Sequence, residues 1–296
     1  MSARRLYLAL AVGGSISIVL LYLVMVRTAP GQRLDVLALE GRKAADLDAR
    51  RFATELMGAA TWFAAVLVGG LVTFVAHRRA GRAAALATAA AIVGSALCSR
   101  AAKTGLPRDA LYEHQWVGPS NTFPSGHAAV GATLALLLVV VAPARWRRAV
   151  AVVVGGLLGA QCAVLVASGW HRPSDVAGGL ALAMLLVGLL GAWHPDLASA
   201  PHPPPRPAQV LLDRVGLWMR TAIVAAAAMS LGLLVVRRGE DDLHWFDGFS
   251  LAVVGLVVLG LLVTIAFSVA PDLPQPGKSR DSTPRSDDSI SAAARR

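Results

Sequence analysis

The sequence predicts an all-α, polytopic membrane helical bundle. Of its 296 residues, 55% are hydrophobic, and the mean hydropathy is +0.58. Several apolar runs approach the roughly 20 residues that a helix needs to cross a bilayer. Short segments that contain arginine separate these runs. Together these observations argue against a soluble single-domain enzyme and indicate a chain that crosses a membrane several times.

The net charge of +10 is explained by membrane topology, and we expect no nucleic-acid partner. The arginines cluster in short segments between apolar runs, where positive charge sets the orientation of a membrane protein. Cys98 and Cys162 both fall inside apolar runs, which suggests neither a disulfide nor a metal-binding pair. The first apolar run is too long for the hydrophobic part of a signal peptide, so it predicts a membrane anchor.

The composition divides the chain into five parts. Residues 1–52 hold a first span and a polar segment, which fits a helix on the membrane surface or a solvated loop equally well. Residues 53–193 hold a core of spans, 194–220 a Pro-rich linker, 221–270 two further spans, and 271–296 a polar tail that predicts disorder. The eight predicted spans cover about 6–26, 58–76, 83–99, 124–142, 149–167, 173–193, 221–236 and 248–270.

Two short turns, 78–82 and 145–148, carry only basic charge. Basic turns face the cytoplasm in most membrane proteins, so we expect a multi-pass protein of the cell membrane with both termini in the cytoplasm. The loops that precede the fourth and sixth spans then lie on the extracytoplasmic side.

The sequence from Asn121 to His127 joins a polar loop to an apolar run. Pro124, Ser125 and Gly126 suit the start of a helix, where free N–H groups attract anions. His127 then lies at the rim of the membrane and can exchange a proton near neutral pH. The alternative is a plain helix cap, but a histidine at this depth is costly without a function.

A second set of polar residues follows the fifth span. Two crossings of the membrane separate it from the loop before His127, so both lie at the same face of the membrane. His171 and Asp175 share a helix face, and the carboxylate can orient the imidazole as in an activated nucleophile. Lys103 and Arg108 precede the fourth span and can converge on a phosphate. Taken singly, each pair is better explained as ordinary interfacial or loop residues, and only together with Pro-Ser-Gly-His do they indicate a site. A metal site is disfavoured because the neighbouring cations would repel the metal.

These residues resemble the motifs of the type 2 phosphatidic acid phosphatase (PAP2) superfamily over about 53–193. The family carries a lysine–arginine segment, then Pro-Ser-Gly-His, then Ser-Arg-x5-His-x3-Asp, on a six-span core; this chain would add two C-terminal spans. The resemblance implies a metal-independent phosphatase without a cofactor. His171 would be the nucleophile, Asp175 its orienting group, and His127 the acid for the leaving oxygen. The phosphate oxygens would be held by Lys103, Arg108, Ser125 and Gly126.

The sequence departs from the family pattern at the third motif, where Val164 and Leu165 stand in place of Ser-Arg. Losing such a charge can cost on the order of a hundred- to a thousandfold in rate. Arg172 or Arg100 can substitute for it, because phosphoryl transfer depends on positioned charge. In the first motif, Lys103 and Arg108 are closer together than in the family, and Asp109 follows in place of proline.

The sequence therefore predicts an integral membrane enzyme that hydrolyses a lipid phosphate or pyrophosphate through a phosphohistidine. Its substrate would be a membrane lipid of the isoprenoid carrier pyrophosphate or phosphatidic acid type. The Ala- and Arg-rich composition is typical of a bacterial source. The alternative is a weak or inactive homologue that binds phospholipid, as the missing arginine suggests. A transporter is disfavoured because no ionisable residue lies in the middle of a span.

Overall fold

The computed structural model describes residues 3–40, 47–112, 121–198 and 245–269. The Pro-rich segment, the span predicted at 221–236 and the polar tail lie outside these ranges. Within them the chain forms helices and no strand, which confirms the all-helical fold class. The elements are α1 (Ala3–Leu21), the π-helical turn η1 (Tyr22–Val26), α2 (Ala29–Glu40), α3 (Leu47–Gly105), α4 (Gly126–Val141), α5 (Arg147–Ala167), α6 (Pro173–Trp193), the short 3-10 helix η3 (Pro195–Ala198) and α8 (Trp245–Val269).

Five of the described helical segments are long and apolar enough to cross a membrane. They are Ala3–Val26, Thr61–Gly105, Arg147–Ala167, Pro173–Trp193 and Ala252–Val269, and the apolar helix Gly126–Val141 is shorter. The predicted second and third spans both belong to α3, which bends sharply at Gly81, where φ is 82°. Only glycine adopts that backbone angle readily, so the basic turn can reverse the chain here. The total of eight spans stays a prediction.

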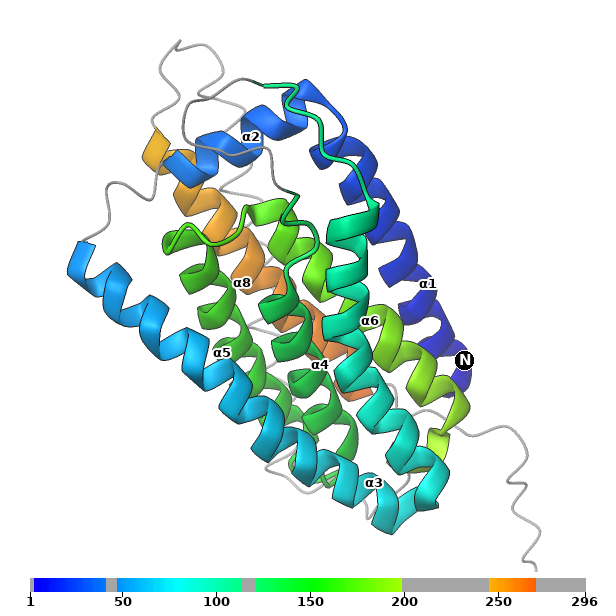
Figure 1. The fold of residues 1–296 in the computed structure, drawn as a ribbon. Coiled ribbons are helices and arrows are strands. Elements are labelled where there is room, and N and C mark those ends of the chain that lie inside the picture. Colours follow the sequence, from blue (N-terminus) through cyan, green and yellow to red (C-terminus); the bar gives the residue numbers. More distant parts are fainter. Residues whose placement is uncertain (1–2, 41–46, 113–120, 199–244, 270–296) are drawn as a thin grey trace, which may run out of the picture.

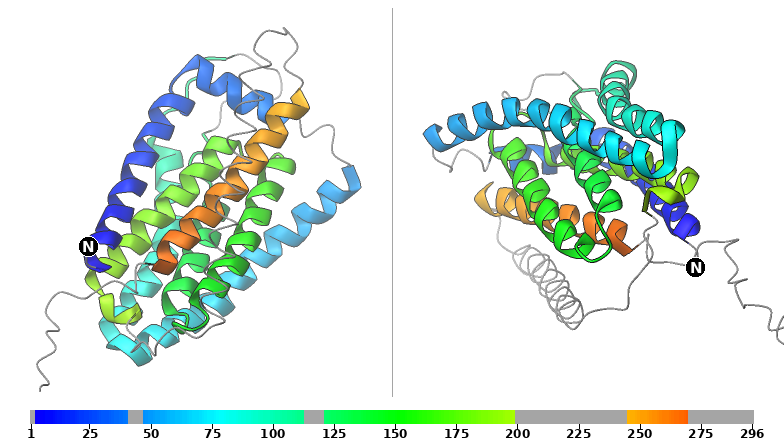
Figure 2. Two further views of the ribbon diagram at one scale, coloured as in Figure 1. Left: turned by 180° about the vertical axis from the view of Figure 1, so that it is seen from behind. Right: turned by 90° about the horizontal axis from the view of Figure 1, so that it is seen from below.

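Helix α6 lies at the centre of the bundle, between α1 and α4 (Figures 1 and 2). Its glycines allow α1 to approach closely: a Cβ atom on Gly188 would lie 2.8 Å from the backbone nitrogen of Ala11. The opposite face of α1 exposes Val12, Ile16 and Val19, each more than half accessible. Because these side chains are apolar, that face suits contact with lipid rather than with water.

The polar segment after α1 contains a helix, α2, which lies across one end of the bundle (Figure 1). The structure has a helix here, as one of the two alternatives expected, while its position on a membrane surface stays a prediction. It packs against α8, η1 and the beginning of α6. Five of its last six residues are buried, so α2 is a fixed part of the described structure. It covers the same end of the bundle at which α3 ends and α4 and α6 begin.

Candidate active site

Two histidines from different helices meet at the end of the bundle that α2 covers. His127 lies in the first turn of α4, and His171 lies between the end of α5 and the beginning of α6. The centroids of their imidazole rings are 6.3 Å apart. His127 is half-buried, and the side chain of His171 is only 8% exposed. The two rings therefore face one small region, close enough for both to reach a single phosphoryl group.

The Pro-Ser-Gly-His segment forms the start of α4 through a serine cap. Ser125 has extended backbone angles, and its Oγ accepts a hydrogen bond from the N–H of Ala128 at 3.3 Å. The N–H of Ser125 donates to the carbonyl oxygen of Asp175 at 2.8 Å. The start of α4 is thus bonded to the first turn of α6. Ser99 of α3 adds a third helix, because its hydroxyl donates to the carbonyl of Pro124 at 2.7 Å.

A tight turn after α5 brings His171 to this place. Gly169 follows the last turn of α5 with a φ of 76°, and the N–H of His171 returns to the carbonyl of Leu165 at 3.2 Å. Arg172 is extended, as expected for a residue before proline, and Pro173 begins α6. The side chain of Leu165 is fully buried in the apolar core. The position that carries arginine in the family therefore contributes no charge to this site.

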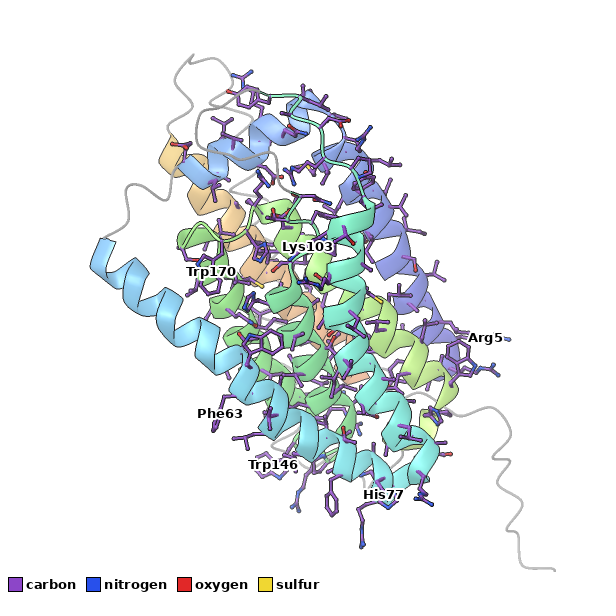
Figure 3. The ribbon with its side chains drawn as sticks, viewed as in Figure 1. Arg5, Phe63, His77, Lys103, Trp146 and Trp170 are labelled. Carbon is purple, nitrogen blue, oxygen red and sulfur yellow. The ribbon has the colours of Figure 1, made fainter. Side chains whose placement is uncertain are left out.

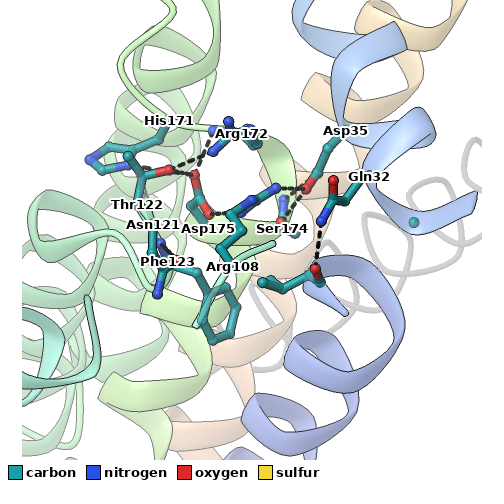
Figure 4. A network of polar contacts seen from close by, with 12 residues as sticks. Gln32, Asp35, Arg108, Asn121, Thr122, Phe123, His171, Arg172, Ser174 and Asp175 are labelled. Atoms are coloured by element: carbon teal, nitrogen blue, oxygen red, sulfur yellow. Dashed lines mark hydrogen bonds and ion pairs between the residues drawn. The ribbon is translucent and has the colours of Figure 1, made fainter. Parts of the chain in front are cut away.

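Asp175 lies in the first turn of α6 and is fully buried (Figure 4). Its Oδ2 accepts hydrogen bonds from the hydroxyl of Thr122 at 2.6 Å and the N–H of Arg172 at 2.9 Å. The same oxygen lies 3.8 Å from Nδ1 of His171, too long for a hydrogen bond but within the distance of an ion pair. Nδ1 is buried and has no hydrogen-bond partner among the described residues. Because Nδ1 faces the carboxylate, Nε2 is the ring nitrogen that is left for a substrate.

The three predicted cations occupy different environments. Lys103, in the last turn of α3, lies within electrostatic range of His127 and Asp175 (Figure 3). The Nη1 atom of Arg172 donates to the hydroxyl of Thr122 at 2.9 Å, while its buried Nε has no hydrogen-bond partner in the described part of the chain. Burial, and then the charge of Arg108, lowers the pKa of Arg172.

Arg108 lies between two carboxylates instead of facing the imidazoles. Its Nη1 is 3.3 Å from Oδ1 of Asp175, and its Nη2 is 3.4 Å from Oδ2 of Asp35. Only 5% of the Arg108 side chain is exposed. An arginine held in this way cancels buried negative charge, because a guanidinium can satisfy two carboxylates at once. To bind a phosphate as well, Arg108 would have to divide its N–H donors between the phosphate and these two carboxylates.

Sequence reasoning missed Asp35, which belongs to the same polar network. Its carboxylate accepts hydrogen bonds from the backbone N–H of Ser174, at 3.1 Å, and from the Ser174 hydroxyl. Burial, and then the nearby charge of Asp175, raises the pKa of Asp35 to about 6. One signal was available: Gln32 and Asp35 stand three apart, so on a helix these two polar side chains share a face.

Two tryptophans flank His127. The ring of Trp170 lies 5.2 Å from the imidazole between centroids, and the ring of Trp62 lies 6.2 Å from it. Both tryptophans are exposed, by 38% and 58% respectively. Beneath them, the side-chain amide of Gln161 donates to the carbonyl of His127 at 3.1 Å. His127 therefore lies between two aromatic rings and a buried side-chain amide.

The fold and this site define an integral membrane protein that holds two imidazoles, a carboxylate and cations at one end of its helical bundle. Residues 84–198 match the family model of the PAP2 superfamily, which confirms the resemblance for this part of the chain. Members of that superfamily are generally phosphatases, so the match supports activity on phosphate esters. No curated protein and no solved structure matches the chain.

Proposed function

We propose that the protein is an integral membrane phosphatase that hydrolyses a lipid phosphate or pyrophosphate. The observation that carries the proposal is the pair of imidazole rings at 6.3 Å, with a buried carboxylate behind one of them. One ring can attack a phosphorus atom while the other protonates the oxygen that leaves. Such a division of labour is the usual arrangement of nucleophilic catalysis with a general acid.

In the first step, Nε2 of His171 attacks the phosphorus atom. The P–N bond forms, the bond from phosphorus to the lipid oxygen breaks, and His127 gives its proton to that oxygen. In the second step, a water molecule attacks the phosphohistidine, and His127 takes a proton from it. The P–N bond breaks, which releases inorganic phosphate and restores both imidazoles. Asp175 favours the positive charge on His171 because its carboxylate faces Nδ1 at 3.8 Å.

Negative charge on the transferred group needs positive groups around it. Arg172 supports this role best, since it adjoins His171 and has a buried Nε without a hydrogen-bond partner in the described residues. Lys103 supplies a second charge. The alternative substitute, Arg100, is exposed, which favours Arg172 as the replacement for the family's third-motif arginine. The backbone of Gly126 and the hydroxyl of Ser125 lie at the start of α4, where a helix attracts anions.

A lipid substrate is favoured by what surrounds the site. The described helices offer apolar surface to the bilayer, and Trp62 and Trp170 extend that surface to His127. Tryptophan is typical of the boundary between headgroups and acyl chains. We propose that a phosphate headgroup enters there, on the extracytoplasmic side, while its hydrocarbon stays in the membrane. An isoprenoid carrier pyrophosphate, phosphatidic acid and phosphatidylglycerol phosphate all have this form.

The test is phosphate release from these lipids by purified protein in detergent with EDTA. We expect the wild type to be active, His171→Ala to be inactive, and His77→Ala to match the wild type. His77 is an exposed histidine at the opposite end of the bundle (Figure 3), so the same substitution there controls for general damage. Trapping labelled phosphate on the wild type but not on His171→Ala would identify the intermediate. Activity in the His171→Ala protein would rule out this mechanism.

A second function is favoured by one observation, the burial of Leu165 in the apolar core. A protein without the family's third-motif arginine could bind phospholipid headgroups without hydrolysing them. Folded wild-type protein that binds phosphatidic acid in vesicles but releases no phosphate from any lipid would support this alternative.

A further inference from the structure

We propose that Asp35 of α2 is a positioning residue that holds Arg108 and the first turn of α6, and so keeps Asp175 aligned behind His171. Asp35 lies outside residues 84–198, the part of the chain that matches the family. The inference rests on the proposed function, because it concerns the alignment of that site. It assigns to α2 a part in the reaction, although Asp35 need not touch the substrate.

Asp35 fixes the beginning of α6 directly. Both its oxygens accept hydrogen bonds from Ser174, one from the backbone N–H at 3.1 Å and one from the hydroxyl. Ser174 precedes Asp175, and its N–H is one of those that a helix leaves unpaired in its first turn. A buried carboxylate that takes this N–H therefore determines where the first turn of α6 begins. The side chain of Asp35 is 0% exposed, so water cannot replace it without rearrangement.

Asp35 also fixes Arg108. The guanidinium bridges Asp35 at 3.4 Å and Asp175 at 3.3 Å, and its side chain is almost fully buried. Two carboxylates share one cation in this bridge (Figure 4). If Asp35 lost its charge, Arg108 would interact with Asp175 alone. The carboxylate would then be more strongly neutralised and would support a positive charge on His171 less well.

A glutamine one helical turn away fastens α2 to the segment that carries Arg108. The side-chain amide of Gln32 donates to the carbonyls of Val26, at 2.8 Å, and of Asp109, at 2.7 Å. Its oxygen accepts the N–H of Leu111 at 3.1 Å. Three backbone groups on two segments are thus bonded to one buried side chain. Through Asp35 and Gln32, α2 thus holds Arg108 and the residues next to it in place.

The experiment compares Asp35→Asn with Asp109→Asn in the phosphate-release assay. Asp109 undergoes the same chemical change beside Arg108, but its side chain is 59% exposed in a surface ion pair with Arg27. We expect Asp35→Asn to lower kcat by about tenfold or more, as supporting residues around a catalytic group do, with KM changed less than twofold. Asp109→Asn should leave kcat within about twofold, because exposed ion pairs contribute little.

A pH profile separates alignment from a general structural role. The pKa of Asp35 is about 6, so the wild type loses the charge that holds Arg108 as the pH falls through this value. Asp35→Asn lacks this step, so the acidic limb of its log kcat/KM should lie at lower pH. Asp35→Glu, which keeps the charge, should leave the limb in place. Loss of folded protein would lower the whole profile without moving this limb. The described charged groups that face Asp35 or His171 are Arg108, Asp175, Arg172, His127 and Lys103.

The inference is overturned if Asp35→Asn and Asp109→Asn have the same kcat and the same acidic limb. Where Asp35→Asn does not fold, Ser174→Ala removes one hydrogen bond to Asp35 and should lower kcat more than Ser15→Ala, whose hydroxyl bonds only within α1. Equal activity of these two serine variants would also overturn the inference.

The proposed function can fail separately. If wild-type protein releases no phosphate from any lipid, a double-mutant cycle on thermal unfolding still tests the link. Asp35→Asn, Arg108→Gln and the double variant should give a total shift in midpoint smaller than the sum of the two single shifts. Additive shifts would show that Asp35 does not hold Arg108.

Discussion

At the scale of single residues, we propose that Arg172 takes the place of the arginine that the family pattern has at position 165. Its guanidinium is next to His171 in the chain and is held by the hydroxyl of Thr122 at 2.9 Å. Thr122 in turn donates to Asp175, so one hydroxyl group is hydrogen-bonded to both the guanidinium and the carboxylate. Burial lowers the pKa of Arg172, but arginine stays protonated in proteins. The site therefore has a charged donor, although this chain lacks the arginine of the family's third motif.

Replacing Arg172 tests this substitution. We expect Arg172→Ala to lower kcat/KM for phosphate release by about 100-fold or more, the usual cost of losing a group that stabilises a developing oxyanion. Arg172→Lys should recover part of the loss, since it keeps the charge without the planar fork. The matched control is Arg100→Ala, because Arg100 is exposed. A loss below tenfold in Arg172→Ala, or an equal loss in both alanine variants, would contradict the assignment.

The buried carboxylate of Asp35 predicts a pH-dependent stability. Its pKa is about 6 in the folded protein against an ordinary value of 3.8, so the folded state binds this proton more tightly than the unfolded state. The resulting stabilisation is complete below pH 3.8 and is lost as the pH rises through about 6. We expect the thermal midpoint of the wild type, relative to that of Asp35→Asn, to fall between about pH 4 and 6. A difference that stays constant over this range would contradict the raised pKa.

Residue order alone predicted part of this site. His127, His171 and Asp175 could be placed on one face because each stands at the end of an apolar run, and the number of crossings between the runs is even. Asp35 and Thr122 could not, because their partners are Ser174 and Asp175, far away in the chain and in segments without periodicity. The sequence also could not show that Arg108 is shared by two carboxylates, since this depends on how α2 lies over the bundle end.

At the scale of elements, close contact between α1 and α6 depends on glycine. Gly188 faces the backbone of α1, where a Cβ atom would lie 2.8 Å from the nitrogen of Ala11 and 2.9 Å from the carbonyl oxygen of Tyr7. Neither backbone atom can move without moving its helix. Because α6 carries Asp175 in its first turn, separation of the two helices would also disturb the site.

Gly188→Ala should therefore destabilise the protein. We expect a cost of about 1–3 kcal/mol, the range for overfilling a packed interface, seen as a lower thermal midpoint in detergent. The matched control is Gly13→Ala on α1, where an added Cβ atom meets nothing within 4 Å. That variant should be neutral or slightly stabilised, because alanine is the better helix former. A Gly188→Ala protein as stable as the Gly13→Ala protein would show that α1 and α6 are not in this contact.

The helices themselves were well predicted by apolar runs, for a reason that α3 illustrates. The runs 58–76 and 83–99 predict two spans with a basic turn between them, and the bend at Gly81 falls in that turn. Apolar length is sufficient for such segments because the bilayer requires it. The bilayer requires no such apolar length of α2, whose position depends on buried polar contacts made by Gln32 and Asp35. Its composition therefore fitted a loop as well as a helix.

At the scale of the whole molecule, the candidate site and the basic turn of α3 lie at opposite ends of the bundle. Lys103 and Trp170 mark the end with the site, while His77 and Trp146 mark the other end (Figure 3). The orientation of the protein therefore decides which side of the membrane the site can reach. The turn at 78–82 contains Arg78, Arg79 and Arg82 without an acidic residue, which favours the cytoplasm for that end.

Cysteine labelling in intact cells tests this orientation. In a chain with Cys98 and Cys162 replaced by alanine, Ala83→Cys places an exposed thiol beside the basic turn, and Leu111→Cys places one near Arg108 at the other end. A membrane-impermeant maleimide added outside the cells should label Leu111→Cys and should reach Ala83→Cys only after lysis. Both variants must be labelled equally after lysis, which controls for expression and thiol reactivity. The reverse pattern would place the site in the cytoplasm, where it would act on lipid phosphates of the inner leaflet.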